Sequence, residues 1–109
     1  MSFRVKVTSN FEKAAKPLLK KYSSLKNDLL ILINQLEITP DLGVALGGGL
    51  FKIRLAIKSK GRGKSGGARI ITFIIKKESL VYLVSVYDKA ELDAVKVTEL
   101  LKILKEEGL

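Results

Sequence analysis

The sequence has 109 residues, 47% of them hydrophobic, and carries 20 Lys and Arg against 11 Asp and Glu, a formal net charge of +9. That length suits one core, so we expect a single domain over residues 1–109. With no Cys and no His, the chain lacks disulfides, thiol or imidazole catalysis and the usual zinc ligands, and we expect no metal and no cofactor. The positive charge favours an acidic partner such as nucleic acid, anionic lipid or an acidic protein segment.

The sequence shows no sign of a membrane protein. No apolar run approaches the ~20 residues that span a bilayer, and the first residues, MSFRVKV, lack the long apolar core of a signal peptide. We therefore expect a cytoplasmic protein without a membrane partner.

The first half of the chain predicts one strand and two helices. Residues 3–7 alternate apolar and basic side chains, which predicts a half-buried strand. Ser9 and Glu12 have the spacing of a capping box, and apolar residues then recur at helical spacing as far as Tyr22. A second amphipathic helix is predicted at about 25–37. Residues 42–49, LGVALGGG, are expected to form a loop, because successive glycines lose much backbone entropy in a regular element.

The second half predicts three strands and a last helix. Residues 50–57, 68–76 and 80–88 have the alternation of strands, the last two joined by a tight hairpin. A helix at about 94–107 ends at Gly108. The predicted fold is α+β with the order βααβββα, a mainly antiparallel four-stranded sheet and helices packed on one face.

The segment KSKGRGKSGGARIITF, residues 58–73, looks at first like a nucleotide-binding loop. A Walker A loop needs a glycine five positions before Gly63, where this chain has Lys58, and it needs a helix afterwards. A strand follows instead, so the nucleotide interpretation fails. The plainest alternative is a solvated hairpin tip in which Gly and Lys are soluble turn residues.

Charge argues against the solvated tip. Residues 51–77 contain no acidic residue, although solvated faces usually mix both signs. The basic residues of this span are Lys52, Arg54, Lys58, Lys60, Arg62, Lys64, Arg69, Lys76 and Lys77.

Strand alternation would bring some of these groups together. Lys52 and Arg54 lie on the face of their strand opposite its apolar side, and Arg69 lies on one face of the next strand. Tyr87 and Lys89 share a face of the strand after it. If the three strands are neighbours, these groups converge beside the glycine-rich turn, where guanidinium, an aromatic ring and bare backbone would suit single-stranded RNA.

Such a surface could also cleave RNA. The substrate's own 2′-hydroxyl can act as nucleophile, so the protein needs only a base, an acid and positive groups around the phosphate. Lysine can act as the base where neighbouring cations favour its neutral form, so neither histidine nor metal is required. The one acid near this surface, Asp88, is as consistent with a turn or cap as with a functional role.

The segments FKIRLA, KGRGKSGGARIITF and LVSVYDKAELDAV, followed by a terminal helix, resemble the RelE superfamily of bacterial toxins, particularly its HigB-like branch. The resemblance implies a RelE-like fold and an mRNA interferase of a type II toxin-antitoxin system. Such toxins cut mRNA in the ribosomal A site and are neutralised by a cognate antitoxin. The expected partners are therefore mRNA on the ribosome and an antitoxin protein.

The resemblance also implies roles for individual residues. Arg69 matches an arginine that contacts the scissile phosphate, Lys52 and Arg54 match a basic pair, and Lys89 matches a basic residue near the end of its strand. A tyrosine that acts in some members falls at Val95 here, which leaves Tyr87 as the candidate substitute. HigB-like members often use histidine, which this chain lacks.

The leading hypothesis is thus a ribosome-dependent mRNA endoribonuclease that inhibits translation. Arg69 would stabilise phosphate charge, Lys89 or Lys60 would transfer protons, and Tyr87 would assist. The expected RNA-binding residues are Lys52, Arg54, Lys58, Arg62 and Lys64. The alternatives are a non-enzymatic toxin similar to the ParE branch, which inhibits DNA gyrase, and an RNA-binding module without cleavage.

Overall fold

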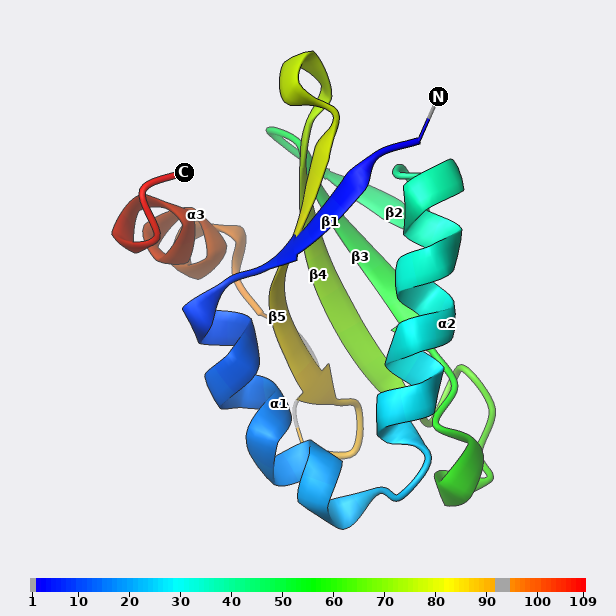
Figure 1. Cartoon of the computed structure of the whole chain (residues 1–109). Coiled ribbons are helices and arrows are strands. Elements are labelled where there is room, and N and C mark those ends of the chain that lie inside the picture. Colours follow the sequence, from blue (N-terminus) through cyan, green and yellow to red (C-terminus); the bar gives the residue numbers. More distant parts are fainter. Residues whose placement is uncertain (1, 92–94) are drawn as a thin grey trace.

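The computed structural model describes residues 2–91 and 95–109, and its described part forms five strands and three α-helices (Figure 1). The strands are β1 (Arg4–Val7), β2 (Val44–Gly47), β3 (Leu50–Leu55), β4 (Ala68–Ile75) and β5 (Leu80–Asp88). The helices are α1 (Ser9–Lys21), α2 (Leu25–Ile38) and α3 (Val97–Glu106), and two short 3-10 turns are η1 (Lys58–Lys60) and η2 (Lys76–Glu78). Within this part, no helix is both long and apolar enough to cross a bilayer.

The sheet is mixed and has the spatial order β1-β5-β4-β3-β2. β1 runs parallel to β5, whereas the other neighbouring pairs are antiparallel. The predicted α+β class is confirmed, but the predicted four-stranded sheet is wrong, because residues 44–47 add a fifth strand at the edge. The described order is therefore βααββββα.

β2, which was not predicted, forms because of the same glycines from which a loop was predicted. Gly47 of β2 pairs with Leu50 of β3, which leaves Gly48 and Gly49 as a two-residue turn with φ of 62° and 89°. Two successive positive φ values are what a tight hairpin of this kind requires, and glycine adopts them without steric cost. The glycine run is therefore a hairpin turn rather than a loop.

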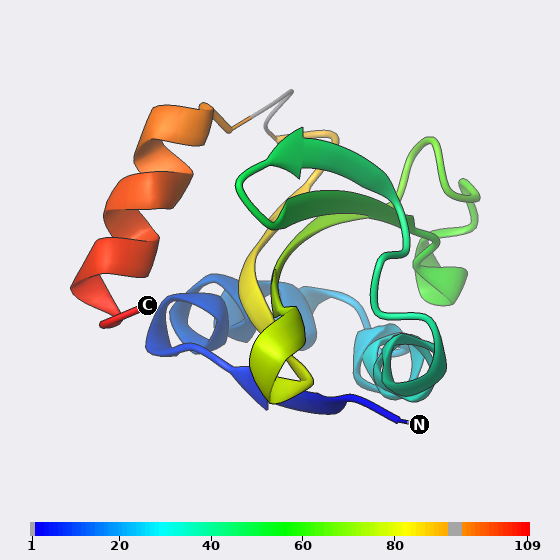
Figure 2. The same cartoon turned by 90° about the horizontal axis from the view of Figure 1, so that it is seen from above.

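Helices cover both faces of the sheet, so the prediction that they pack on one face is wrong (Figure 2). Residues of α1 and α2 share one core cluster with the sheet, including Leu25, Leu36 and Ile70. Leu100 and Leu104 of α3 belong to a second cluster on the opposite face. The apolar stripe of α3 is the same whichever face it covers, so the sequence pattern could not decide between them.

The cap of the first helix lies one residue earlier than predicted. The side chain of Thr8, not Ser9, accepts the hydrogen bond from the Phe11 amide, at 3.1 Å. The Ser9 hydroxyl instead donates to Glu107, just after α3, at 2.8 Å, and this bond is the main cause of a lowered pKa of Glu107. The last helix ends before Gly108 as predicted, and the predicted start at residue 94 lies outside the described residues.

Candidate nucleic-acid interface

Three of the predicted site residues lie in one row across the sheet. Arg54 of β3 pairs with Arg69 of β4, and Arg69 pairs with Tyr87 of β5. Directly paired residues on neighbouring strands point to the same face, which here is the face that carries α3. The expected convergence of these three residues is therefore seen, whereas their roles remain predictions.

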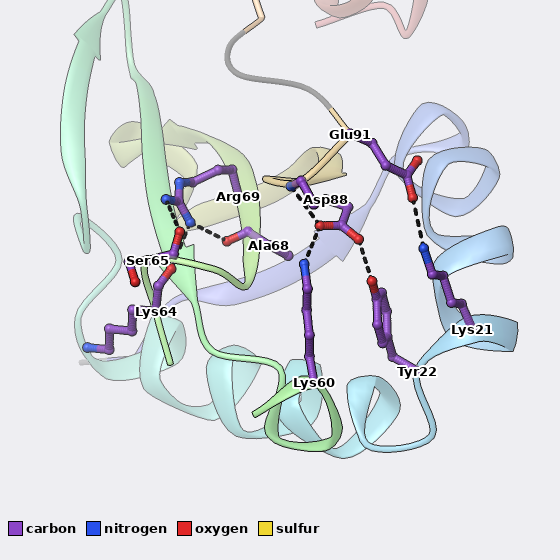
Figure 3. Close-up of polar contacts among 10 residues, drawn as sticks. Lys21, Tyr22, Lys60, Lys64, Ser65, Ala68, Arg69, Asp88 and Glu91 are labelled. Atoms are coloured by element: carbon purple, nitrogen blue, oxygen red, sulfur yellow. Dashed lines mark hydrogen bonds and ion pairs between the residues drawn. The ribbon is translucent and has the colours of Figure 1, made fainter. Parts of the chain in front are cut away.

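Arg69 is held by the glycine-rich loop that precedes its strand. Its Nη1 donates to the carbonyl oxygens of Lys64, at 2.8 Å, and of Ala68, at 3.2 Å (Figure 3). Its Nη2 donates to the carbonyl oxygen of Ser65, at 3.2 Å. The residue is only 5% exposed, so the loop folds around the guanidinium, and the fork is fixed in position by backbone acceptors.

Tyr87 lies beside Arg69 in a dry environment. The residue is 7% exposed and packs in the cluster that includes Leu100 and Leu104. Burial raises the pKa of Tyr87, and the Arg69 charge opposes that rise. Its hydroxyl is buried and finds no hydrogen-bond partner among the described residues. A neutral phenol beside a guanidinium is a donor that could face a developing negative charge.

The start of the basic loop is fastened to the beginning of α2. The buried carboxylate of Asp28 accepts hydrogen bonds from the Ser24 hydroxyl, at 2.8 Å, and from the Lys58 amide, at 3.2 Å. The amide of Ser59 donates to the Ser24 hydroxyl at 2.8 Å. These bonds fix the path of η1, so the loop leaves the sheet from a rigid base.

Lys60 belongs to a different group of residues from Arg69. Its Nζ lies 2.6 Å from Oδ1 of Asp88, and their side chains are 12% and 0% exposed. The Tyr22 hydroxyl donates to Oδ2 of Asp88 at 2.5 Å, and the Ala90 amide donates to Oδ1 at 2.9 Å. Figure 3 shows Lys60 and Tyr22 reaching Asp88 while Arg69 points to the loop carbonyls. The structure therefore does not bring Lys60 into the row of Arg69.

Asp88 is charged in this network. Burial, the largest single influence, would raise the pKa of Asp88, but hydrogen bonds from Lys60, Tyr22 and Ala90 together outweigh it. The result is a pKa lowered from 3.8 to about 2. Asp88 and Lys60 thus form an ion pair that is shielded from solvent.

Four of the predicted RNA-binding residues line one groove. It has a volume of about 500 Å³ and lies between α2 and the edge of the sheet formed by residues 52–56. Lys52, Arg54, Lys58 and Lys64 all contribute to its lining, together with apolar residues of α2. A groove lined by both apolar and basic residues can hold the backbone of a single strand of nucleic acid. The fifth predicted residue, Arg62, is exposed on the loop and does not line this groove.

The remaining candidates lie near the end of β5. The Lys89 amide donates to the Gly67 carbonyl at 3.1 Å, which places this residue next to the end of the glycine-rich loop. Val95 packs against the cluster of Leu100 and Tyr87, so its place is filled by an apolar contact. In the described ranges, no group of three or more Asp and Glu is arranged to hold a metal ion.

The network around Asp88 is what sequence patterns missed. The sequence suggested a turn or functional role for Asp88 and a core position for Tyr22. It did not predict their contact, because the partners are distant in sequence. The Tyr22–Asp88 and Lys60–Asp88 contacts span 66 and 28 residues. A useful signal was that Asp88 is the first acid after Glu78 and is the last residue of a strand of mostly buried residues.

Comparison with known proteins agrees with this architecture. A solved structure of the Escherichia coli toxin RelE, a double mutant in the free state, superposes with a TM-score of 0.61 at 16% sequence identity, and the match covers 100% of both chains. That likeness supports the fold alone. Residues 3–107 match the family model described as the RelE toxin of the RelE/RelB toxin-antitoxin system. Because this match spans nearly the whole chain, the protein belongs to the RelE toxin family.

Proposed function

We propose that the protein is a ribosome-dependent mRNA endoribonuclease, the toxin of a toxin-antitoxin pair that inhibits translation in the cytoplasm. Membership of the RelE toxin family supports the toxin role. The nuclease role rests on the row of Arg54, Arg69 and Tyr87, which lies on the α3 face of the sheet. Arg54 also lines the basic groove, which lies between α2 and the edge of the sheet. The HigB-like branch stays a prediction, as does the ParE-like alternative.

The proposed reaction needs only groups of the chain and of the RNA. The 2′-hydroxyl loses its proton to a base and attacks the neighbouring phosphorus, and the bond to the 5′-oxygen breaks as that oxygen gains a proton. The products are a 2′,3′-cyclic phosphate and a 5′-hydroxyl, so atoms balance without water or metal. Catalysis then depends on positioning and on donors aimed at the pentacoordinate phosphate.

Arg69 is proposed to stabilise the phosphate charge. Three of its hydrogen bonds now go to carbonyls, which are uncharged acceptors, whereas a phosphate is an anion that can pair with the guanidinium in the bidentate geometry. We infer that bound RNA replaces part of the loop's contacts with the guanidinium. Arg69 is 5% exposed, so this exchange requires the loop around residues 64–66 to shift.

Proton transfer is assigned to groups at the end of β5. Lys89 lies beside the end of the loop through its bond to Gly67. The neutral phenol of Tyr87 would donate to the leaving oxygen once the same shift of the loop uncovers its buried hydroxyl. Lys60 is a poorer candidate, because its ammonium is held by Asp88 at 2.6 Å. The RNA-binding role is proposed for Lys52, Arg54, Lys58, Arg62 and Lys64, and a cognate antitoxin would cover the same basic surface with acidic residues.

The test is primer extension on a defined mRNA in a reconstituted translation reaction. We expect cuts on translated mRNA only, and their loss in Arg69→Ala. The matched control is Arg4→Ala, which removes an exposed arginine from β1, at the other edge of the sheet, and should leave cutting unchanged. Absence of cuts with folded wild-type protein would sink the nuclease proposal, and inhibition of gyrase supercoiling in a parallel assay would then favour the ParE-like function.

A further inference from the structure

The carboxylate of Asp88 joins three separate segments at one end of the sheet. Lys60 comes from η1 at the start of the basic loop, Tyr22 follows the last residue of α1, and Ala90 lies in the turn after β5. Asp88 itself is 2% exposed and pairs with Ala68, the first residue of β4. One buried side chain therefore ties the loop's start to the strand that also carries Tyr87.

The loop between these anchors has few other restraints. Residues 61–67 include four glycines, and all of 61–65 are exposed. Its far end is held by the Arg69 guanidinium and by the bond from Lys89 to Gly67. Its near end is held by the contacts of η1, which include the bond from the Lys58 amide to Asp28 and the Lys60–Asp88 ion pair. A glycine-rich segment keeps one conformation only where its ends are fixed.

A buried ion pair is a poor stabiliser of a fold compared with apolar groups of the same size, because both charges lose their hydration. Its remaining value is to specify one geometry, since each charge must find its partner. At this site the specified geometry is that of the basic loop. Lys60 lies near the Tyr22 ring as well, with its Nζ 5.6 Å from the ring centre, which further limits where η1 can sit.

We propose that Asp88 is a positioning residue that, through Lys60 and Tyr22, holds the basic loop of residues 58–67 in the conformation that binds RNA. That this conformation binds RNA rests on the proposed function, whereas the effect of Asp88 on the loop does not. Asp88 lies on the α1 and α2 side of the sheet and so acts on the loop rather than on the reacting atoms.

The central experiment uses Asp88→Asn, because simple electrostatics and a positioning role predict opposite changes in the affinity for RNA. Removing a negative charge near a basic groove should strengthen RNA binding if charge alone matters. Positioning predicts weaker binding: a loop that holds the binding conformation about a tenth of the time binds about tenfold more weakly. Affinity is measured by fluorescence anisotropy with a labelled single-stranded RNA, and exchange of the loop amides by mass spectrometry.

The matched control is Glu91→Gln. Glu91 is a nearby carboxylate with a side chain that is 60% exposed, paired with Lys21 at 3.3 Å. This variant removes the same charge from the same region without touching the buried pair, so it should bind RNA as well as wild type or better. Its loop amides should exchange at the wild-type rate.

Two further variants separate positioning from stability. Lys60→Met combined with Asp88→Asn removes both charges and should recover much of the urea resistance that each single variant loses, while its loop amides still exchange faster. Tyr22→Phe deletes one hydrogen bond and should raise loop exchange by a smaller factor. If Asp88→Asn does not fold, the double variant and Tyr22→Phe decide the question.

The outcomes are distinct for the two proposals. Unchanged loop exchange in folded Asp88→Asn and in the double variant, or tighter RNA binding by Asp88→Asn, would overturn the positioning role. Faster loop exchange in these variants, with wild-type protein that binds no RNA, would support the positioning role and refute the proposed function instead.

Discussion

At the scale of single residues, Arg69 is the side chain that the glycine-rich loop holds in place. It is 5% exposed, and its guanidinium donates to the carbonyls of Lys64, Ser65 and Ala68. The same side chain is the one that we assign to the phosphate. Arg69 therefore has a structural role in the free protein and a chemical role with RNA, and experiments must separate the two.

Arg69→Ala should lower the free energy of unfolding by about 1–3 kcal/mol, because three carbonyl oxygens, of which that of Ala68 is buried, lose their donor. Urea unfolding followed by circular dichroism measures the change. Arg54→Ala, which removes the exposed neighbour in the same row, should change stability by about 0.5 kcal/mol or less. If the two variants lost the same free energy of unfolding, the hydrogen bonds from Arg69 to the loop carbonyls would not stabilise the fold.

Asp88 gives a prediction of pH dependence. Its pKa is lowered from 3.8 to about 2, so its contribution is complete above pH 4 and is lost as the pH falls through 2. The lowering corresponds to about 2 kcal/mol of stability. Urea unfolding between pH 4 and pH 2 should therefore show a smaller loss of stability for Asp88→Asn than for wild type. Parallel pH profiles for the two proteins would contradict this assignment.

At the scale of elements, sequence patterns located the strands and helices better than their arrangement. The long alternating segments that became β3, β4 and β5 were found because each has a buried face. β2 was missed because four residues bounded by glycine give too short a pattern. The row of Arg54, Arg69 and Tyr87 followed from alternation, but the Lys60–Asp88 pair required knowledge of how η1 folds back on the sheet.

The junction between β3 and β4 depends on a glycine. A Cβ on Gly67 would lie 2.0 Å from the carbonyl oxygen of Leu55, a backbone atom that cannot move aside cheaply. Gly67→Ala should therefore destabilise the fold by about 2 kcal/mol or more, as overpacking of a tight contact does. Thermal unfolding measures the change.

The control for Gly67→Ala is Gly61→Ala. Gly61 has a φ of +72°, and a Cβ there would meet nothing within 4 Å. Only backbone strain of about 1 kcal/mol should result. If Gly61→Ala proved the more damaging of the two, close approach at Gly67 would not be what holds the junction together.

At the scale of the whole molecule, residues 51–69, which form the basic loop and part of the groove, carry seven Lys and Arg and no acid. Residues 51–77 carry no acid, while Asp28 and Asp88 near the loop are both occupied by internal hydrogen bonds. The proposed RNA-binding surface therefore keeps its positive charge. This arrangement favours a polyanionic partner over a neutral one.

Affinity for single-stranded RNA should fall steeply with salt. If five basic residues each neutralise a phosphate, the logarithm of the affinity should fall against the logarithm of salt concentration with a slope of about −3.5. Lys58→Ala should reduce the magnitude of that slope by about 0.7. Lys76→Ala, in η2 at the opposite end of the sheet, should leave it unchanged (Figure 1). A flat salt profile would argue for an apolar interface instead.

The central claim is that Arg69 stabilises the phosphate charge while mRNA is cleaved on the ribosome. The most direct measurement is the single-turnover rate of mRNA cleavage by Arg69→Ala on programmed ribosomes, at protein concentrations that saturate binding. We predict a rate about 10²–10³-fold below wild type, the usual loss when one donor to a developing oxyanion is removed. A saturated rate within about twofold of wild type, in folded protein, would contradict the claim, since it would leave less than about 0.5 kcal/mol for Arg69 in the transition state.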